Sequence, residues 1–169
     1  MNLQTKFTIA SEEGLKMLFL LKKEHIQQMY GNQVDAEDLR NYLDEQLSNQ
    51  NAADQLNNLS TQLITVFADA EPAGYALIKQ ALAPEALKGI KAINYASFYI
   101  LEKYDSQAIR ECLWKKCLSV TNFYNAFWIE LLQNDPLIPF FEDCGFKINQ
   151  LSQLEPFGKK SVVMIWRRN

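Results

Sequence analysis

The first third of the chain shows one strand-like segment followed by helical patterns. Residues 3–9 (LQTKFTI) alternate apolar and polar side chains, which predicts a β-strand. Ser11 can cap a helix whose apolar residues recur at helical spacing until Gly31 ends the run. A second helix is predicted over 36–48. The Asn- and Gln-rich stretch that continues to Ser60 is interpreted as frayed helix or loop.

The middle of the chain changes to the pattern of strands. Two apolar segments, 63–70 (LITVFADA) and 74–82 (GYALIKQAL), are separated by a turn over 69–73, and a third segment follows at 92–101. The intervening PEALKG supplies a second turn. Three such segments predict an antiparallel meander.

The last third alternates helix and strand patterns and closes with two strand-like segments. A nearly continuous apolar run in its middle is typical of a strand that is covered on both faces. The predicted elements are a helix over 106–120, the buried strand over 126–132, a short helix over 136–144 that Gly145 ends, and a hairpin of 146–154 with 161–168.

Early helices, a meander and a strand–helix–strand tail together predict the fold class. They indicate an α+β domain whose mixed α/β sheet has six to seven strands and about four helices. A length of 169 residues fits a single globular domain, and we find no internal repeat or linker. We therefore expect one domain over 1–169.

Composition excludes several classes of function. The net charge is −3 and the pI is about 5.2, with the basic residues dispersed, so we expect no nucleic-acid partner. The longest apolar runs, 17–21 and 162–166, are far too short to span a bilayer, so no membrane association is expected. The first residues lack the apolar core of a signal peptide, which favours a cytoplasmic protein.

Cysteine and histidine are too few for several kinds of site. Cys112, Cys117 and Cys144 form no C-x-x-C pair, and His25 is the only histidine. We therefore predict no metal site and reduced, structural thiols. Nucleophile schemes that need an imidazole base would have to rely on His25 alone, and its position in a helical period favours a structural or exposed role.

Three segments resemble those of the GNAT acyltransferases, and the likeness covers nearly the whole chain. Residues 66–78 (VFADAEPAGYALI) are similar to the strand–turn–strand that carries "VAE" and "GYA" in that family. Residues 97–118 (SFYILEKYDSQAIRECLWKKCL) resemble its strand, phosphate loop and helix. Residues 134–146 (NDPLIPFFEDCGF) keep the spacing of "N…A…FYEKLGF". The order of elements is also that of the family.

This resemblance implies an N-acyltransferase that uses acetyl-CoA or another acyl-CoA. The pantetheine arm would add like an extra strand where two parallel strands splay, bonding to the backbone of Tyr99, Ile100 and Leu101. The pyrophosphate would bind amides at the start of the next helix, where the helix dipole favours an anion. The residues implied there are Ser106, Gln107, Ala108, Ile109 and Arg110. Asn134 and Phe141 are implied as further cofactor contacts.

The phosphate loop departs from the family pattern. Family members usually have Gln/Arg-x-x-Gly-x-Gly/Ala, whereas this chain has Asp105-Ser-Gln-Ala-Ile-Arg110. The Asp105 carboxylate would repel the pyrophosphate if it pointed inward, and the Arg110 guanidinium could offset that repulsion. Alternatively, both side chains point to solvent.

The residues that usually act in catalysis are also changed. Phe141 stands where the family often has a tyrosine acid, and Asn94 and Ala96 stand where it commonly has a carboxylate base. Glu130 interrupts the apolar strand and is the remaining candidate for a general base, unless it points outward at the end of the strand. Tyr95, Tyr99 and Tyr124 are candidate acids.

Two readings of function follow. The first is an N-acyltransferase acting on a primary amine of a small molecule or peptide. The second is a catalytically degenerate GNAT-like module that binds a ligand or a protein. The strand-like segment 162–166 (VVMIW) also permits a homodimer through sheet extension or packing.

Overall fold

The computed structural model describes residues 1–169, which divide into two compact units. The first unit contains Met1–Leu77 and Ser97–Val120, and the second contains Ile78–Ala96 and Thr121–Asn169. Two strands, β3 (Glu71–Lys79) and β4 (Ala92–Ile100), run from one unit into the other. A single domain over 1–169 stays a prediction.

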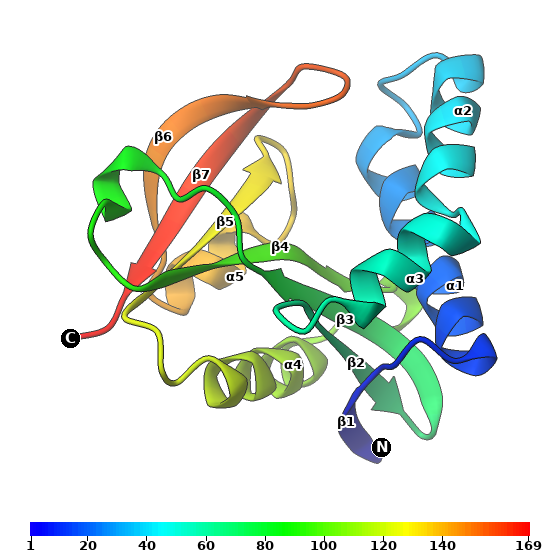
Figure 1. Ribbon diagram of the computed structural model, residues 1–169, viewed down its shortest axis with the longest axis horizontal. Coiled ribbons are helices and arrows are strands. Elements are labelled where there is room, and N and C mark those ends of the chain that lie inside the picture. Colours follow the sequence, from blue (N-terminus) through cyan, green and yellow to red (C-terminus); the bar gives the residue numbers. More distant parts are fainter. The chain divides into compact units, whose positions relative to one another are not determined.

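The first unit begins with a strand and three helices and ends with a long helix (Figure 1). Besides its parts of β3 and β4, its elements are β1 (Leu3–Phe7), α1 (Glu12–Tyr30), α2 (Ala36–Gln46), α3 (Asn49–Asn57), β2 (Gln62–Ala68), the short helix η2 (Glu102–Tyr104) and α4 (Gln107–Val120).

Side-chain caps fix the starts of the early helices. The Ser11 hydroxyl accepts a hydrogen bond from the Gly14 amide at 3.0 Å, and the Asp35 carboxylate accepts one from Glu37 at 3.1 Å. Both confirm the predicted starts. Ser48 caps α3 in the same way, accepting from the Asn51 amide at 3.2 Å. This third helix lies in the stretch predicted as frayed helix or loop, and it raises the number of α-helices to five.

The turn between β2 and β3 is shorter than the predicted one. Asp69 and Ala70 both have positive φ values, of 50° and 70°, and β3 begins directly after them at Glu71. A two-residue turn of this kind matches the twist of the two strands of a hairpin. The strands therefore extend to the turn on both sides, whereas the sequence predicted a turn over 69–73. In the same unit β1 pairs with β2 in antiparallel fashion, and α4 packs against both strands.

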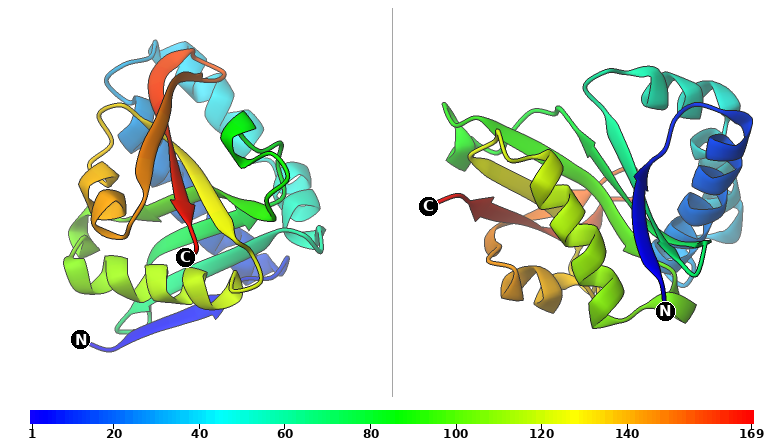
Figure 2. Two further views of the ribbon diagram at one scale, coloured as in Figure 1. Left: turned by 90° about the vertical axis from the view of Figure 1, so that its left-hand side faces the viewer. Right: turned by 90° about the horizontal axis from the view of Figure 1, so that it is seen from below.

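The second unit is built on the central strands of the C-terminal half. Besides its parts of β3 and β4, its elements are the short helix η1 (Glu85–Leu87), β5 (Ala126–Leu132), α5 (Ile138–Asp143), β6 (Lys147–Leu154) and β7 (Lys159–Arg167). Strands β6 and β7 form the predicted closing hairpin and run side by side in Figure 2. Strand β7 also pairs antiparallel with β5 along the whole length of β5.

The strand order is β1-β2-β3-β4-β5-β7-β6. Strands β4 and β5 are parallel, whereas the β1–β2, β5–β7 and β6–β7 pairs are antiparallel, so the sheet is mixed. Seven strands with five α-helices confirm the predicted α+β fold class. No helix in the structure combines the length and the apolar character needed to cross a bilayer.

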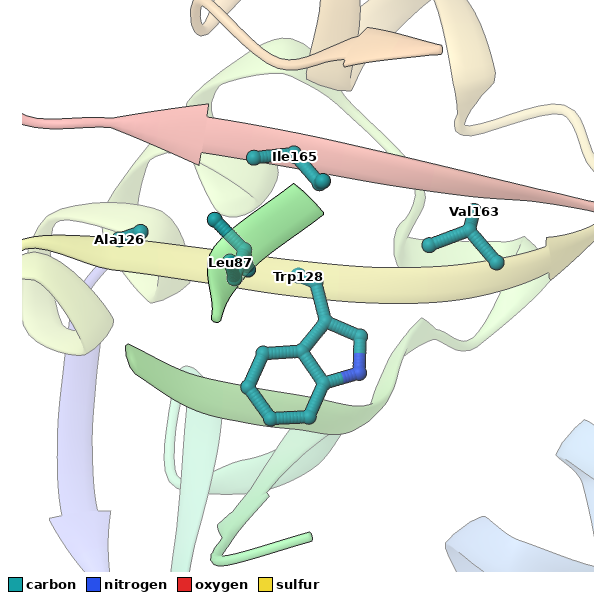
Figure 3. Close-up of a cluster of buried hydrophobic side chains, with 5 residues drawn as sticks. All are labelled: Leu87, Ala126, Trp128, Val163 and Ile165. Carbon is teal, nitrogen blue, oxygen red and sulfur yellow. The ribbon is translucent and has the colours of Figure 1, made fainter. Parts of the chain in front are cut away.

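Both faces of β5 are covered inside the second unit, as its apolar sequence predicted. On one face, Leu87 of η1 lies over a buried cluster from β5 and β7 (Figure 3), whose other members are Ala126, Trp128, Val163 and Ile165. On the other face, the Phe127 ring stacks on Tyr95 at 5.0 Å and on Trp166 at 4.4 Å between ring centroids. Alternate side chains of one strand therefore serve two cores.

Candidate functional site

The end of β4 in the first unit is the strand predicted to carry the pantetheine arm. The Leu101 amide donates to the Ala73 carbonyl of β3 at 2.8 Å, and the Leu101 carbonyl accepts from the Tyr104 amide at 2.9 Å. Because backbone groups alternate in direction along a strand, those of Ile100 face the edge opposite to β3. Of the three predicted backbone partners, Ile100 is therefore the best placed to receive a further strand.

Gly74 explains the close approach of β3 to this segment. A Cβ at this position would overlap the Tyr99 carbonyl oxygen and would lie 2.7 Å from the Ile100 Cδ1 atom. Only a residue without a side chain fits there. The glycine of the "GYA" sequence thus has a packing role that fixes the position of β4.

The start of α4 forms the loop predicted to bind the pyrophosphate. The Arg110 amide donates to the Ser106 carbonyl at 3.1 Å, which is the first intrahelical bond, and the Ser106 hydroxyl accepts from the Ile109 amide at 3.4 Å. The amides of Gln107 and Ala108 therefore have no acceptor within the helix. Ala108 is exposed at this positive end of the helix dipole. These groups fit the binding of an anion.

Asp105 and Arg110 are paired with each other. The Arg110 Nε and Nη2 atoms donate to the two carboxylate oxygens of Asp105, each at 2.6 Å. The side chain of Asp105 is 28% exposed, and that of Arg110 is 23% exposed. The hydrogen bond from Asp105 raises the pKa of the Arg110 guanidinium above its ordinary value. The structure thus pairs the two charges with each other, an arrangement that neither sequence reading described.

A polar and aromatic cluster lies behind β4 in the first unit. The His25 Nδ1 atom lies 2.7 Å from the Tyr75 hydroxyl oxygen, and the His25 ring stacks on Tyr99 at 4.6 Å between centroids. Burial, and then the charge of Lys22, lower the pKa of His25 to about 3. The ring is therefore neutral at physiological pH. His25 has the structural role that its place in the helical pattern favoured.

Tyr99 itself stays protonated. Burial raises its pKa to about 12, and the nearby carboxylates of Glu24, Glu102 and Asp105 act in the same direction. The sequence did not predict the contact of Tyr99 with His25. The only available signal was that His25 falls one residue before the buried Ile26 on a helix predicted to face the core.

In the second unit, the parallel pairing of β4 with β5 covers three residues of each strand, ending at Asn94 and Trp128. At this last pair the Asn94 side-chain amide donates to the Trp128 carbonyl at 3.2 Å. Beyond it β5 continues to Leu132 alongside β7. The splay of the two strands stays a prediction.

Glu130 lies in the second unit on the same side of β5 as Trp128. It is half-buried, and its Oε1 atom accepts a hydrogen bond from the Ser161 hydroxyl at 2.6 Å. Ser161 is 1% exposed and comes from the neighbouring strand β7. The carboxylate is therefore held by a bond that fixes its direction. Its role as a general base stays a prediction.

The short helix α5 carries the position of the missing tyrosine. Phe141 is fully buried and packs edge-on against Phe140 and Phe146, with ring centroids 5.4 and 5.1 Å away. Asn134 is exposed in the turn that follows β5. In the same turn, Asp135 accepts from the Leu137 amide at 2.8 Å, and burial raises the pKa of that carboxyl. The predicted cofactor contacts of Asn134 and Phe141 stay predictions.

Two of the tyrosines considered as acids have partners within the second unit. Tyr95 is fully buried, and its hydroxyl is hydrogen-bonded to that of Thr121 at 2.9 Å. The Tyr124 hydroxyl accepts from the Gln80 side-chain amide at 2.9 Å. Their roles as acids stay predictions. The three cysteines form no disulfide.

The candidate residues divide between the two units. Tyr99, Ile100 and Leu101 lead directly into the loop and helix start of Asp105–Arg110 in the first unit, whereas Glu130, Asn134 and Phe141 belong to the second. The backbone edge at Ile100 fits an extended chain that carries amides, and the amides of Gln107 and Ala108 fit an anion. The charge of the Asp105 carboxylate opposes an anion in this loop.

Comparison with known proteins adds several solved structures of similar fold. No family model matches the sequence. The structure of the PaiA N-acetyltransferase of Thermoplasma acidophilum, in complex with coenzyme A, matches with a TM-score of 0.78 at 15% identity, over 99% of this chain and 100% of the other. A probable acetyltransferase of Staphylococcus epidermidis matches with a TM-score of 0.73 at 14% identity, over 99% and 100%.

A third similar structure is a GNAT family acetyltransferase of Elizabethkingia anophelis with acetyl-CoA bound. It matches with a TM-score of 0.61 at 13% identity and covers 99% of each chain. At such low identity these likenesses concern the fold. They extend over nearly the whole chain in each case.

Proposed function

Starting from the GNAT fold that this chain has, we propose that the protein binds an acyl-CoA and transfers its acyl group to a primary amine. The acceptor is a small molecule or a peptide. The observation that carries the proposal is the start of α4, which follows β4 in the chain and where the amides of Gln107 and Ala108 lack intrahelical acceptors. The acyl-CoA supplies an activated thioester.

Binding relies mainly on backbone groups. The edge of β4 at Ile100 receives the pantetheine amides, and Tyr99 and Leu101 hold that strand in place through His25 and Ala73. The diphosphate lies at 106–110 in this proposal, where the amides of Gln107 and Ala108 are the ones without an acceptor in the helix. Backbone recognition of this kind tolerates the change from glycine to Ala108, because a methyl group adds little bulk. Asn134 and Phe141, in the second unit, stay predicted cofactor contacts.

Chemistry requires the amine to lose a proton before it attacks. We assign the acceptance of this proton to the Glu130 carboxylate. Its Oε1 atom is held by the Ser161 hydroxyl, and the side chain is half-buried. Phe141 offers no hydroxyl to protonate the departing thiolate. A thiolate is a sufficiently good leaving group to depart without an acid, so positioning and deprotonation suffice.

The proposal is tested by calorimetry with acetyl-CoA and by thiol release in the presence of a panel of amines. In Glu130→Gln, kcat is expected to fall by about 10²- to 10⁴-fold. Its dissociation constant for acetyl-CoA should stay unchanged. Ser161→Ala is the matched variant, since it removes only the bond that orients the carboxylate, and its kcat should fall less. Full activity of Glu130→Gln would exclude this base.

A second candidate function is a GNAT-like module that binds without catalysis. It is favoured by the neutralised loop, in which Arg110 is already bonded to Asp105, and by the hydrophobic residue at Phe141. Failure to bind acetyl-CoA even at millimolar concentration would count against the enzyme and for this alternative.

Three further predictions remain predictions. They are one domain over 1–169, a cytoplasmic location and a homodimer.

A further inference from the structure

The Asp105–Arg110 pair spans the start of the helix proposed to bind the diphosphate. Two hydrogen bonds of 2.6 Å join the guanidinium to the carboxylate in the side-by-side geometry that arginine also uses for phosphate. A carboxylate and a phosphate oxygen pair are therefore interchangeable ligands for Arg110. In this loop, the chain supplies one of them itself.

The pair is not needed to complete the helix cap. Ser106 provides the carbonyl that accepts from the Arg110 amide and the hydroxyl that accepts from the Ile109 amide, and the Asp105 amide is already bonded to the Glu102 carbonyl at 3.1 Å. Both carboxylate oxygens of Asp105 are directed to Arg110. The side chain thus satisfies a cation rather than the backbone of α4.

We propose that Asp105 competes with the cofactor's diphosphate for Arg110. By holding both donors of the Arg110 guanidinium, Asp105 sets the affinity of the loop for the diphosphate. This inference rests on the proposed function. When the cofactor binds, the guanidinium exchanges its bonds to Asp105 for bonds to phosphate oxygens, and the released carboxylate adds repulsion at the same place. Asp105 therefore lowers the affinity of the loop for acyl-CoA.

The competition acts only on ligands that carry the diphosphate. S-acetylpantetheine has the thioester and the pantetheine amides but neither the diphosphate nor the nucleotide, so its contacts lie along β4. Its affinity should not depend on Asp105. This difference separates a loop effect from a general change in the fold.

The test is calorimetry of acetyl-CoA and S-acetylpantetheine with four full-length variants. Asp105→Asn is expected to bind acetyl-CoA about tenfold more tightly, which corresponds to about 1.4 kcal/mol, with S-acetylpantetheine unchanged. Glu111→Gln is the matched control, because it removes a nearby carboxylate of α4 that is bonded to Gln107 rather than to Arg110. It should change the affinity by less than about twofold.

The arginine side of the pair gives a second, independent measurement. Arg110→Gln should weaken acetyl-CoA binding by about tenfold, because the carboxylate is left without its partner. The double variant Asp105→Asn with Arg110→Gln should recover part of that loss. Thermal unfolding of each variant verifies the fold, so that the double variant decides the outcome if Asp105→Asn alone is unstable.

The outcomes distinguish the two proposals. Equal or weaker acetyl-CoA binding by Asp105→Asn, with normal binding by the unaltered protein, overturns the competitor role and leaves the proposed function standing. Binding by Asp105→Asn but not by the unaltered protein supports the competitor role and contradicts use of the cofactor by the natural loop. Absence of binding by both overturns both proposals. A similar gain in Glu111→Gln reduces the effect to net charge and overturns the specific role.

Discussion

His25 illustrates how a single ionisable residue ties the stability of the first unit to pH. Its ring is buried between Tyr75 and Tyr99, and its pKa is about 3 in the folded chain against an ordinary value of 6.5. Below pH 6.5 the unfolded chain takes up a proton that the folded chain refuses. Stability contributed by the neutral ring is therefore complete above pH 6.5 and is lost progressively as the pH falls towards 3.

We predict that the free energy of unfolding falls between pH 7.5 and 5.5 by roughly 1 kcal/mol more in the natural protein than in His25→Gln. Glutamine keeps a hydrogen-bonding group for the Tyr75 hydroxyl but does not titrate. Urea unfolding at pH 7.5, 6.5 and 5.5 measures the two slopes. Parallel slopes would show that His25 is protonated in the folded state or that its site opens easily.

At the scale of elements, the junction of β3 with β4 depends on the absence of a side chain at Gly74. We predict that Gly74→Ala destabilises the protein by about 2 kcal/mol, because the two strands must separate to admit the methyl group. The same shift displaces Tyr99 and Ile100, so acetyl-CoA binding should also weaken. Chemical denaturation and calorimetry measure the two effects.

Gly89→Ala provides the comparison for that substitution. Gly89 has a φ of +78°, but a Cβ there meets nothing within 4 Å. Its replacement should therefore cost only the backbone strain, about 1 kcal/mol, and leave acetyl-CoA binding unchanged. An equal loss of cofactor binding in both variants would mean that the approach of β3 to β4 does not control the site.

The elements that sequence could predict are those whose signals are local. Caps at Ser11 and Asp35 and the apolar run of β5 were read correctly because each depends on neighbouring residues. The sequence does not distinguish helix α3 from a loop, because its polar, amide-rich residues have little apolar periodicity, although Ser48 caps it. The sequence predicts a longer turn than the two residues Asp69 and Ala70 of the structure. Neither residue type indicates a positive φ as a glycine would.

The candidate site was predictable to the same extent. The strand end and the helix start after it were identified from a sequence resemblance, and the structure has both. The bond between Asp105 and Arg110 could not be chosen over solvent exposure, because two rotatable side chains five residues apart have several geometries. The contact of His25 with Tyr75 joins residues 50 positions apart, and no pattern along the chain encodes it.

At the scale of the whole molecule, cofactor binding should be visible as a gain in stability. We predict that acetyl-CoA at about 100 times its dissociation constant adds about 2.7 kcal/mol to the free energy of unfolding. For a chain of 169 residues this raises the Tm by roughly 5–10 °C. Differential scanning calorimetry measures the shift, and free acetate serves as the control ligand. A Tm that stays constant across this range would contradict the proposed function.

The irregularity in β6 has a consequence for assembly. Strand β7, which contains residues 162–166, has partners on both sides, so the outer strand beside it is β6. The register of β6 shifts between Ile148 and Gln150, which bends the strand and interrupts the straight row of backbone groups that a newcomer would need. The bulge thus hinders edge-to-edge pairing of β6 with further copies of the chain, even though the exposed side chains of Ile148 and Leu151 make this strand apolar.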